Sequence, residues 1–325
     1  MKKSLKNKEA AFFFQSGLFL KDELDRDRDR LVEFYKNEGY QKARVQQAGV
    51  TPSPKKEKDH VDLLFAVAEG TLYHVSEVSF AGGGLASEKE MRERLDLAAG
   101  DKLSQRRLDE GVGRIRDIYT TRGYIYASID PEVSFDDVLG RARVTLRIRE
   151  GSIATIARVL VRGNDETKDK VVLREVLMKP GDIFDTERIR RSQERIYNLG
   201  FFEDVKVYTE PSMESGKEHL VFDVKERQTG TISLGGGYSS QYGLVGFLQL
   251  TKANLFGLGI RVSAEWEIGQ QRRNIQVDYF DPWFWDFPVS LGVGYWHTNR
   301  DLIRSYSEQS TGGSLEFGYR FWDYW

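Results

Sequence analysis

The last part of the chain alternates between apolar side chains and side chains that are polar or small. In residues 261–268, 289–295 and 314–321, every second position is aliphatic or aromatic, and the positions between are mostly Ser, Gly, Glu or Arg. Successive side chains of a β-strand point to opposite faces of its sheet, so a period of two predicts strands with one apolar face. Three more segments follow the pattern and bring the expected number of strands to six: residues 231–239, 244–251 and 275–279.

The first 228 residues show a different pattern, which repeats along the chain. An alternating apolar segment that ends in glycine begins at Tyr73 and again at Ala154, at a constant offset of 81 residues. A segment with helical periodicity follows in each copy, at residues 88–97 and 168–178. A second helix should begin after an N-cap residue, which is Ser104 in one copy and Asp185 in the other.

The second helix of each copy is expected to end where a glycine precedes an aromatic residue, because glycine readily adopts the left-handed conformation that stops a helix. This stop occurs three times, and residues 1–70 contain only the second half of the unit. The third copy is less regular, since Ser192 stands where the other helices have Leu31 and Ile115. The pattern predicts an α+β fold of β-α-α-β-β units at residues 1–70 (truncated at the N-terminus), 71–151 and 152–228, followed by strands at 229–325.

Composition changes sharply near residue 228. Residues 229–325 contain 7 Lys and Arg and 9 Asp and Glu, whereas the whole chain of 325 residues has 48 and 50, and all six tryptophans lie in this last part. The formal net charge of −2 gives no basic field that would attract nucleic acid. Cysteine is absent, which excludes thiol catalysis, thiolate metal sites and disulfides.

Aromatic residues decide between two interpretations of the alternating strands. A soluble antiparallel sheet with one solvated face would show the same period of two. Strands of a membrane β-barrel carry, in addition, aromatic side chains where they meet the membrane interface. Such residues cluster at two expected strand ends, so we interpret them as membrane-interface aromatics: Trp283, Phe284, Trp285, Trp322, Tyr324 and Trp325.

The repeated unit resembles the POTRA domain, the periplasmic module of the BamA-type outer-membrane assembly family. Two motifs in the last part are similar to the early barrel of that family: Asn254-Leu255-Phe256-Gly257-x-Gly259 and Asp281-Pro282-Trp283. The resemblance implies tandem POTRA domains followed by the first strands of a transmembrane β-barrel of about sixteen strands. Because an unclosed sheet edge cannot persist in lipid, we expect the chain to be a fragment of a longer protein.

The resemblance also implies a function. Members of the family fold and insert other outer-membrane proteins, so the expected partners are unfolded outer-membrane proteins, outer-membrane lipid and accessory periplasmic lipoproteins, and no nucleic acid. Clients would add a strand to a POTRA sheet edge. The candidate edges follow each glycine–aromatic stop, at residues 41–48, 125–133 and 205–210, with Ile125, Tyr126, Ala127, Ser128, Val205, Lys206, Val207 and Tyr208 as the client-binding residues.

The first barrel strand, residues 231–239, is similar to the strand that forms one side of the lateral seam in the family. Three consecutive glycines would lower the cost of separating this strand from its neighbour, because glycine packs little surface and weakens a strand. The resemblance therefore implies a seam made by Ile232, Leu234, Gly235, Gly236, Gly237 and Tyr238.

The sequence offers little sign of catalytic or cofactor chemistry. The four histidines, His60, His74, His219 and His297, lack the spacing of metal ligands, and the glycine run is not followed by the Gly-Lys-Ser/Thr of a phosphate loop. No nucleophile, base and orienting acid are grouped, so we expect neither an enzyme nor a cofactor. The basic start of the chain resembles a signal peptide, but its apolar run is short and no cleavage site follows, so we expect the chain to begin within a domain.

Three alternatives remain open. A two-partner secretion transporter also combines POTRA units with a barrel, but typically has two repeats and a plug helix. A soluble interaction protein with a β-rich C-terminal domain would show the same periodicity. A paralogue that assembles autotransporters within the same family cannot be separated by sequence. The favoured interpretation is an assembly factor in the bacterial outer membrane, with its POTRA domains in the periplasm.

Overall fold

The computed structural model describes residues 23–52, 61–240, 243–302 and 306–319, and the chain divides into two compact units, Met1–Ala154 and Thr155–Trp325. Each unit is described by itself. None of the helices in the described ranges has the length and apolar character needed to cross a membrane. Of the aromatic residues expected at the membrane interface, Trp322, Tyr324 and Trp325 lie outside the described residues.

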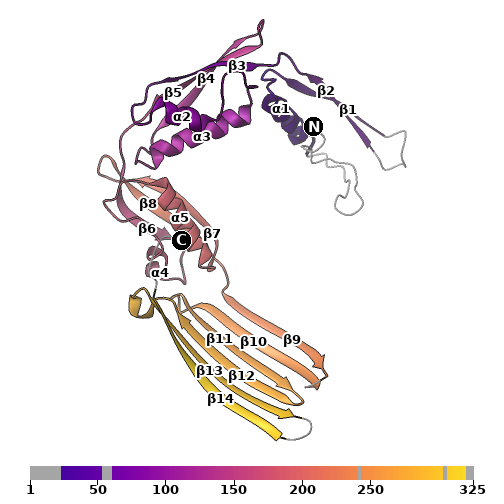
Figure 1. The fold of residues 1–325 in the computed structure, drawn as a ribbon, viewed down its shortest axis with the longest axis vertical. Helices are drawn as coiled ribbons and strands as arrows, with labels where there is room; N and C mark the ends of the chain where they lie inside the picture. Colours follow the sequence, from indigo (N-terminus) through magenta and orange to yellow (C-terminus); the bar gives the residue numbers. More distant parts are fainter. Residues whose placement is uncertain (1–22, 53–60, 241–242, 303–305, 320–325) are drawn as a thin grey trace. The chain divides into compact units, whose positions relative to one another are not determined.

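The first described elements of this unit are helix α1 (Leu24–Asn37) and the antiparallel pair β1 (Arg44–Pro52) and β2 (Val61–Ala68). A complete repeat follows, with β3 (His74–Ala81), α2 (Glu88–Leu95), α3 (Gln105–Thr120), β4 (Ser128–Asp136) and β5 (Arg141–Arg149). Its sheet has the order β3-β5-β4, in which β3 is parallel and β4 antiparallel to β5 (Figure 1). The repeat therefore has the expected β-α-α-β-β order.

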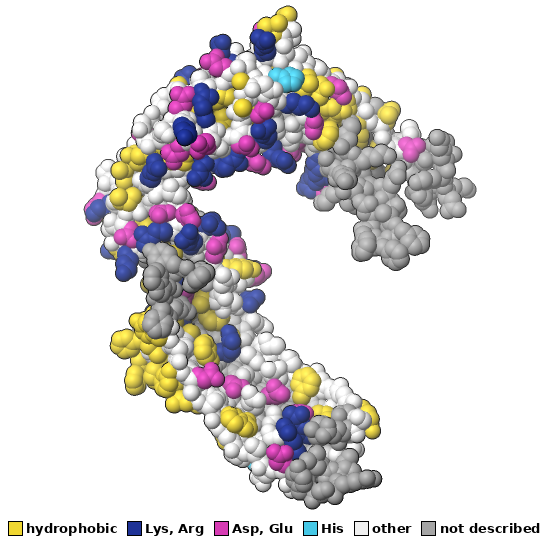
Figure 2. Space-filling model, viewed as in Figure 1, with side chains coloured by type: hydrophobic (Ala, Val, Ile, Leu, Met, Phe, Trp, Pro, Cys, Tyr) yellow, Lys and Arg dark blue, Asp and Glu magenta, His cyan; other side chains and the backbone are white. Residues whose placement is uncertain are grey.

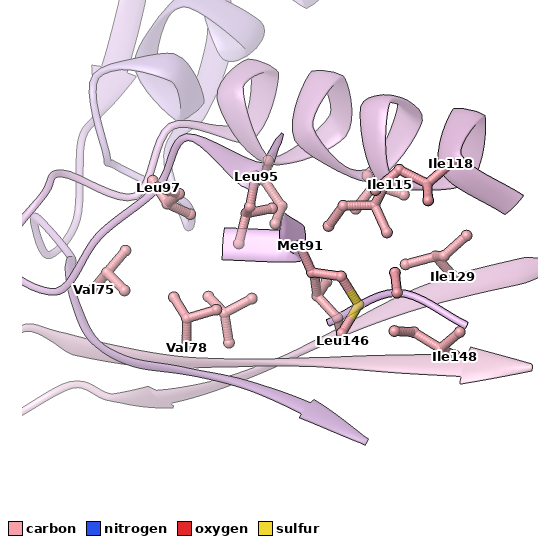
Figure 3. Close-up of a cluster of buried hydrophobic side chains, with 14 of the residues drawn as sticks. Val75, Val78, Met91, Leu95, Leu97, Ile115, Ile118, Ile129, Leu146 and Ile148 are labelled. Carbon is pink, nitrogen blue, oxygen red and sulfur yellow. The ribbon is translucent and has the colours of Figure 1, made fainter. Parts of the chain in front are cut away.

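The hydrophobic core of this repeat lies between the two helices and one face of the sheet. Figure 3 shows Met91 and Leu95 of α2 and Ile115 of α3 facing Leu146 and Ile148 of β5. The strand β5 alternates buried and exposed residues, as the sequence pattern predicts for a sheet with one covered face. The helices begin where their N-caps predict, because Ser87 Oγ accepts from Glu90 N and Ser104 Oγ accepts from Arg107 N.

The first helix–strand unit is joined to this repeat by hydrogen bonds around its glycine stop. Tyr73 N donates to Gly39 O at 3.0 Å, and Gln41 Nε2 donates to Leu103 O at 2.6 Å. Lys42 Nζ and Tyr73 Oη both bind Asp137 Oδ1, at 2.6 and 2.5 Å. Hydrogen bonds from Lys42 and then Tyr73 hold the pKa of Asp137 below its usual range. The residues around Gly39 therefore end helix α1 and also connect the first helix–strand unit to the next repeat.

The second unit contains another repeat and a separate sheet. The repeat comprises β6 (Thr155–Arg162), α4 (Asp169–Leu173), α5 (Thr186–Asn198), β7 (Phe202–Pro211) and β8 (Lys217–Glu226), with sheet order β6-β8-β7. The separate sheet is entirely antiparallel in the order β14-β13-β12-β11-β10-β9 (Figure 1). Its elements are β9 (Gly230–Ser239), β10 (Gly243–Leu255), β11 (Ile260–Gly269), β12 (Arg272–Asp281), the short 3₁₀ helix η3 (Phe284–Asp286), β13 (Val289–Leu302) and β14 (Tyr306–Tyr319). This matches the expected six strands.

The expected helix at residues 168–178 is wrong in length, since α4 ends at Leu173. Side chains of α5 hold the next segment outside a helix: Ser192 Oγ accepts from Leu177 N at 2.9 Å and donates to Arg188 O. Glu175 is buried and forms an ion pair with Arg195. Ser192 is fully buried, and its hydrogen bonds to Leu177 N and Arg188 O accommodate a polar residue at this position of the third copy.

Two other boundaries differ from the sequence prediction. Helix α2 ends at Leu95 and not at residue 97, because Asp96 adopts a left-handed conformation with φ of 53°. Residues 125–127 were expected in a strand but form a turn before β4, in which Ala127 N donates to Tyr124 O. Residues 41–43 likewise precede β1 and form a turn. In both copies the glycine stop needs a few residues to reverse the chain before the sheet begins.

Two glycines of α3 provide a test of how closely the helices pack. A Cβ added at Gly111 would overlap Leu95 O, whereas one added at Gly113 would meet nothing within 4 Å. We expect Gly111→Ala to lower the free energy of unfolding by about 1–3 kcal/mol, because overpacking forces the backbone apart. Gly113→Ala should raise it by about 0.5–1 kcal/mol through helix propensity. Urea unfolding followed by helical circular dichroism measures both, and equal effects would contradict the packing.

A carboxylate at the end of β5 provides a second test. Glu150 Oε1 accepts from Gly84 N at 2.6 Å and Leu85 N at 2.9 Å, and these bonds lower the pKa of Glu150. Its unfolded pKa is about 4.3, so the carboxylate stabilises the fold above that pH and the contribution disappears as the pH falls through the lower folded value. The stability difference between the native protein and Glu150→Gln should therefore shrink on acidification from neutral pH. Glu93→Gln, at an exposed position of α2, controls for the lost charge.

Candidate functional site

Strand β9 lies at one edge of the six-stranded sheet. Among the described residues it pairs with β10 and with no second strand, in a continuous register from Gly243 opposite Ser239 to Lys252 opposite Gly230. The seam residues expected from the sequence therefore lie together on an edge strand. Ile232, Leu234 and Tyr238 expose 72%, 76% and 79% of their surface, so this face of the strand is apolar and uncovered.

The strand register extends this apolar face across the whole sheet. Directly opposed residues of antiparallel strands share a face, and the register aligns Leu234 with Leu248, Leu248 with Trp266, and Trp266 with Ile275. Figure 2 shows the opposite face of the sheet, which carries few hydrophobic side chains. The apolar face carries the apolar residues Ile232, Leu234, Tyr238, Leu244, Leu248, Leu250, Val262, Ala264, Trp266, Ile268, Ile275, Val277, Tyr279, Val289, Leu291, Val293, Tyr295, Leu315, Phe317 and Tyr319.

The opposite face contains an aromatic residue that sequence reasoning missed. Phe247 of β10 is aligned with Gly235, and a Cβ added to Gly235 would overlap the Phe247 ring. The three glycines are therefore not equivalent, since Gly237 has nothing within 4 Å of its added Cβ. The sequence did contain a sign of this contact, because the alternation along β10 places Phe247 on the otherwise polar face of the strand. A similar pair occurs on β13 and β14, where Gly312 lies beneath Trp296.

The three candidate client-binding strands also lie at sheet edges. Strand β4 is the outer strand of β3-β5-β4, β7 is the outer strand of β6-β8-β7, and β1 pairs with β2 alone among the described residues. All four predicted residues of the third copy, from Val205 to Tyr208, belong to β7. Of the four predicted in the second copy, Ser128 belongs to β4, whereas Ile125, Tyr126 and Ala127 lie in the preceding turn.

The aromatic residues after β12 form a tight turn, and their side chains have different surroundings. Trp283 N donates to Asp281 Oδ1, and the rings of Phe284 and Trp285 stack with centroids 4.5 Å apart. Trp285 is 78% exposed, whereas the ring of Trp283 lies beneath the guanidinium of Arg174 at 5.3 Å. Figure 2 shows hydrophobic side chains gathered where β12 joins β13. A membrane-interface role stays a prediction for this run, and Trp283 additionally contacts the repeat.

Within the described ranges, no group of three or more His, Asp or Glu residues is arranged to hold a metal ion. His297 Nδ1 bonds to Thr311 Oγ1 at 2.7 Å across β13 and β14.

Comparison with known proteins identifies the family. The model of the POTRA family, described as surface antigen variable number repeat, matches residues 2–70, 73–151 and 154–227, and the Omp85 superfamily domain matches residues 254–325. The chain belongs to the POTRA family, and the match to the Omp85 superfamily domain follows its repeats. This confirms the family and the fold class expected from the sequence.

Curated relatives agree with this assignment. The chain is 27% identical over 316 residues to the outer membrane protein assembly factor BamA of Neorickettsia risticii, covering 96% of this chain and 42% of that protein. It is 29% identical over 316 residues to BamA of Nitratidesulfovibrio vulgaris, covering 94% and 39%. The chain thus spans about two fifths of the length of these relatives.

Solved structures show the same fold. Haemophilus ducreyi BamA lacking POTRA domains 1–3 superposes with a TM-score of 0.67 at 24% identity, covering 75% of this chain and 47% of that one. POTRA domains 3–5 of Haemophilus influenzae BamA superpose with a TM-score of 0.57 at 21% identity, covering 69% and 89%. The fold of this chain is therefore found in solved structures.

The contact between Phe247 and Gly235 yields a test of the edge strand. Gly235→Val should displace the ring and lower the unfolding free energy of the sheet by about 1–3 kcal/mol. Gly237→Val, two positions along the same strand, should be tolerated because its site is open. Phe247→Ala should reduce the cost of Gly235→Val. All six tryptophans lie within residues 229–325, so their fluorescence during denaturation in detergent reports on this sheet. Equal costs for the two glycine substitutions would argue against the contact.

Proposed function

We propose that the chain forms part of an outer-membrane β-barrel assembly factor, which receives unfolded outer-membrane proteins on its POTRA repeats and promotes their insertion. The observation that carries this proposal is the order of the chain, in which repeats precede an antiparallel sheet with one continuous apolar face that begins with the glycine-rich strand β9. The POTRA and Omp85 matches and the curated BamA relatives support it.

The domain arrangement belongs to the same proposal. Residues 1–70, 71–151 and 152–228 are three POTRA domains in the periplasm, and residues 229–325 are the first strands of a barrel in the outer membrane. The apolar face of the six-stranded sheet contacts lipid, and the aromatic turn after β12 lies at the periplasmic membrane interface. Accessory periplasmic lipoproteins and outer-membrane lipid are further partners.

Insertion proceeds by backbone pairing and involves no enzymatic step. A client strand adds to the outer edge of β4 or β7, and these hydrogen bonds supply affinity without requiring one client sequence. A client hairpin then pairs with β9, which acts as a template because its outward N–H and C=O groups have no strand partner among the described residues. Folding into lipid is itself favourable, so the protein lowers a kinetic barrier and needs no nucleotide.

Client folding into liposomes tests the proposal. A urea-unfolded client barrel should become protected from protease faster in liposomes that contain the complete protein than in empty liposomes. Absence of acceleration, together with export of a passenger or ion conductance, would favour the secretion transporter or a plain channel.

Cysteine crosslinking tests the templating strand directly. The chain has no cysteine, so an introduced residue is the only one within it. Leu234→Cys on β9 should crosslink to a stalled client that carries one cysteine in its terminal strand. Val277→Cys is the matched control, because it shares the apolar face but lies on β12, which is paired on both sides by β11 and β13. Equal crosslinking at both positions would reject β9 as the template.

A further inference from the structure

The turn between β10 and β11 is attached to the third repeat through Asn254. Asn254 is buried and has a left-handed backbone with φ of 58°. Its Nδ2 donates to Thr167 Oγ1 at 2.7 Å, and its Oδ1 accepts from Gly259 N at 2.9 Å. One amide side chain therefore shapes the turn and bonds it to the loop that precedes α4.

Backbone contact strengthens this attachment. Lys168 N donates to Gly257 O at 2.9 Å, and a Cβ on Gly257 would overlap Glu166 O. Gly257 has φ of 72°, a conformation that side chains rarely adopt. The glycine thus permits both the shape of the turn and its close approach to the repeat.

A carboxylate at the end of β8 holds the receiving loop. Glu226 accepts from Glu166 N at 2.9 Å and from Thr167 N at 2.7 Å. Burial alone would raise the pKa of Glu226, but hydrogen bonds from Thr167 and the loop backbone outweigh it and lower the pKa. The carboxylate is therefore charged at neutral pH and fixes the loop in its docking conformation.

The same network reaches the start of the edge strand. Glu226 is the last residue of β8, and β9 begins at Gly230. Thr229, directly before β9, accepts a hydrogen bond from Ala253 N at 3.0 Å, and Ala253 is the neighbour of Asn254. The repeat, the turn and the first residues of β9 are consequently joined within a few residues of chain.

The second repeat shows which part of this network is general and which is particular. Glu150 holds the corresponding loop there through Gly84 N and Leu85 N. At the offset of 81 residues, Thr167 corresponds to Ala86, which has no hydroxyl group. A carboxylate thus holds the loop in both repeats. The hydroxyl group that accepts a hydrogen bond from Asn254 is present in the third repeat and absent from the second.

A second contact restrains the repeat against the sheet. Lys170 Nζ binds both carboxylate oxygens of Asp286, at 2.8 and 2.9 Å, and Arg174 lies over the ring of Trp283. Helix α4 is therefore held by the turn after β12, and the preceding loop by the turn after β10. Two separate points of attachment resist rotation of the repeat about either one.

We infer that Asn254, Thr167 and Glu226 form a clamp that fixes the repeat-proximal end of β9, so that the outer edge of β9 opens first toward its Ser239 end. The inference rests on the proposed seam function of β9. Asn254 is then a positioning residue, since it acts on β9 through the turn and the loop. The glycines at residues 235–237 lie in the half of the strand that is far from the clamp.

Hydrogen exchange of the complete protein in liposomes tests the clamp. In the native protein, amides at residues 230–234 should exchange more slowly than those at 235–239. Asn254→Asp keeps the acceptor for Gly259 N and tolerates the left-handed backbone, but it removes the donor to Thr167. Loss of one such bond should speed exchange at residues 230–234 by about tenfold. Thr167→Val should have a similar effect, and the two changes together should not add.

The matched control is Asn274→Asp. Asn274 is a buried asparagine of the same sheet, and its Oδ1 accepts from Thr298 Oγ1 at 2.6 Å, away from the repeat. It should leave exchange at residues 230–234 unchanged. Equal acceleration by both substitutions, or uniform exchange along native β9, would overturn the inference. Exchange is measured without a client, so a failure of client folding in the native protein would reject the proposed function separately from the clamp.

Discussion

A strand at the edge of a sheet presents backbone N–H and C=O groups that need partners. Such edges occur both in the repeats and in the six-stranded sheet. On β4 and β7 water can satisfy these groups, so the edges are stable and remain available for pairing. The outer edge of β9 has no strand partner among the described residues, and in the lipid environment proposed for this sheet unpaired backbone groups cost several kcal/mol each. An edge strand is therefore tolerated in water, whereas in lipid the same edge strongly favours pairing with another strand.

The sequence predicted those features that rest on periodicity. All six strands of the last part were expected, because alternation sustained over a strand length fits the two-residue period of a β-strand and conflicts with the longer period of a helix. The register places Leu234, Leu248 and Trp266 on one face, as the pattern required. The helix caps at Ser104 and Asp185 were also correct, since a cap depends on its own residue and the next three. Local chemistry is readable from local sequence.

Features that depend on contacts between distant residues could not be read in this way. The length of α4 depends on Ser192 and Arg188, which lie in another helix, and periodicity alone extended the helix too far. The ring of Phe247 on Gly235 requires knowledge of the strand register. Asn254 was recognised as part of a motif, but its bond to Thr167 spans 87 residues of chain and no sequence pattern indicates it. The sequence thus identified the strands that form the site, whereas its individual contacts became visible only in the folded structure.

The short passage from β8 to β9 has a mechanical consequence. A stretch of three residues can extend to roughly 10 Å at most, so it leaves little slack between the repeat and the sheet. A force applied to β7 passes to β8, its direct neighbour in the sheet, and reaches β9 through this short connection. The third repeat is therefore mechanically coupled to β9, and a displacement of the repeat pulls on the first residues of that strand.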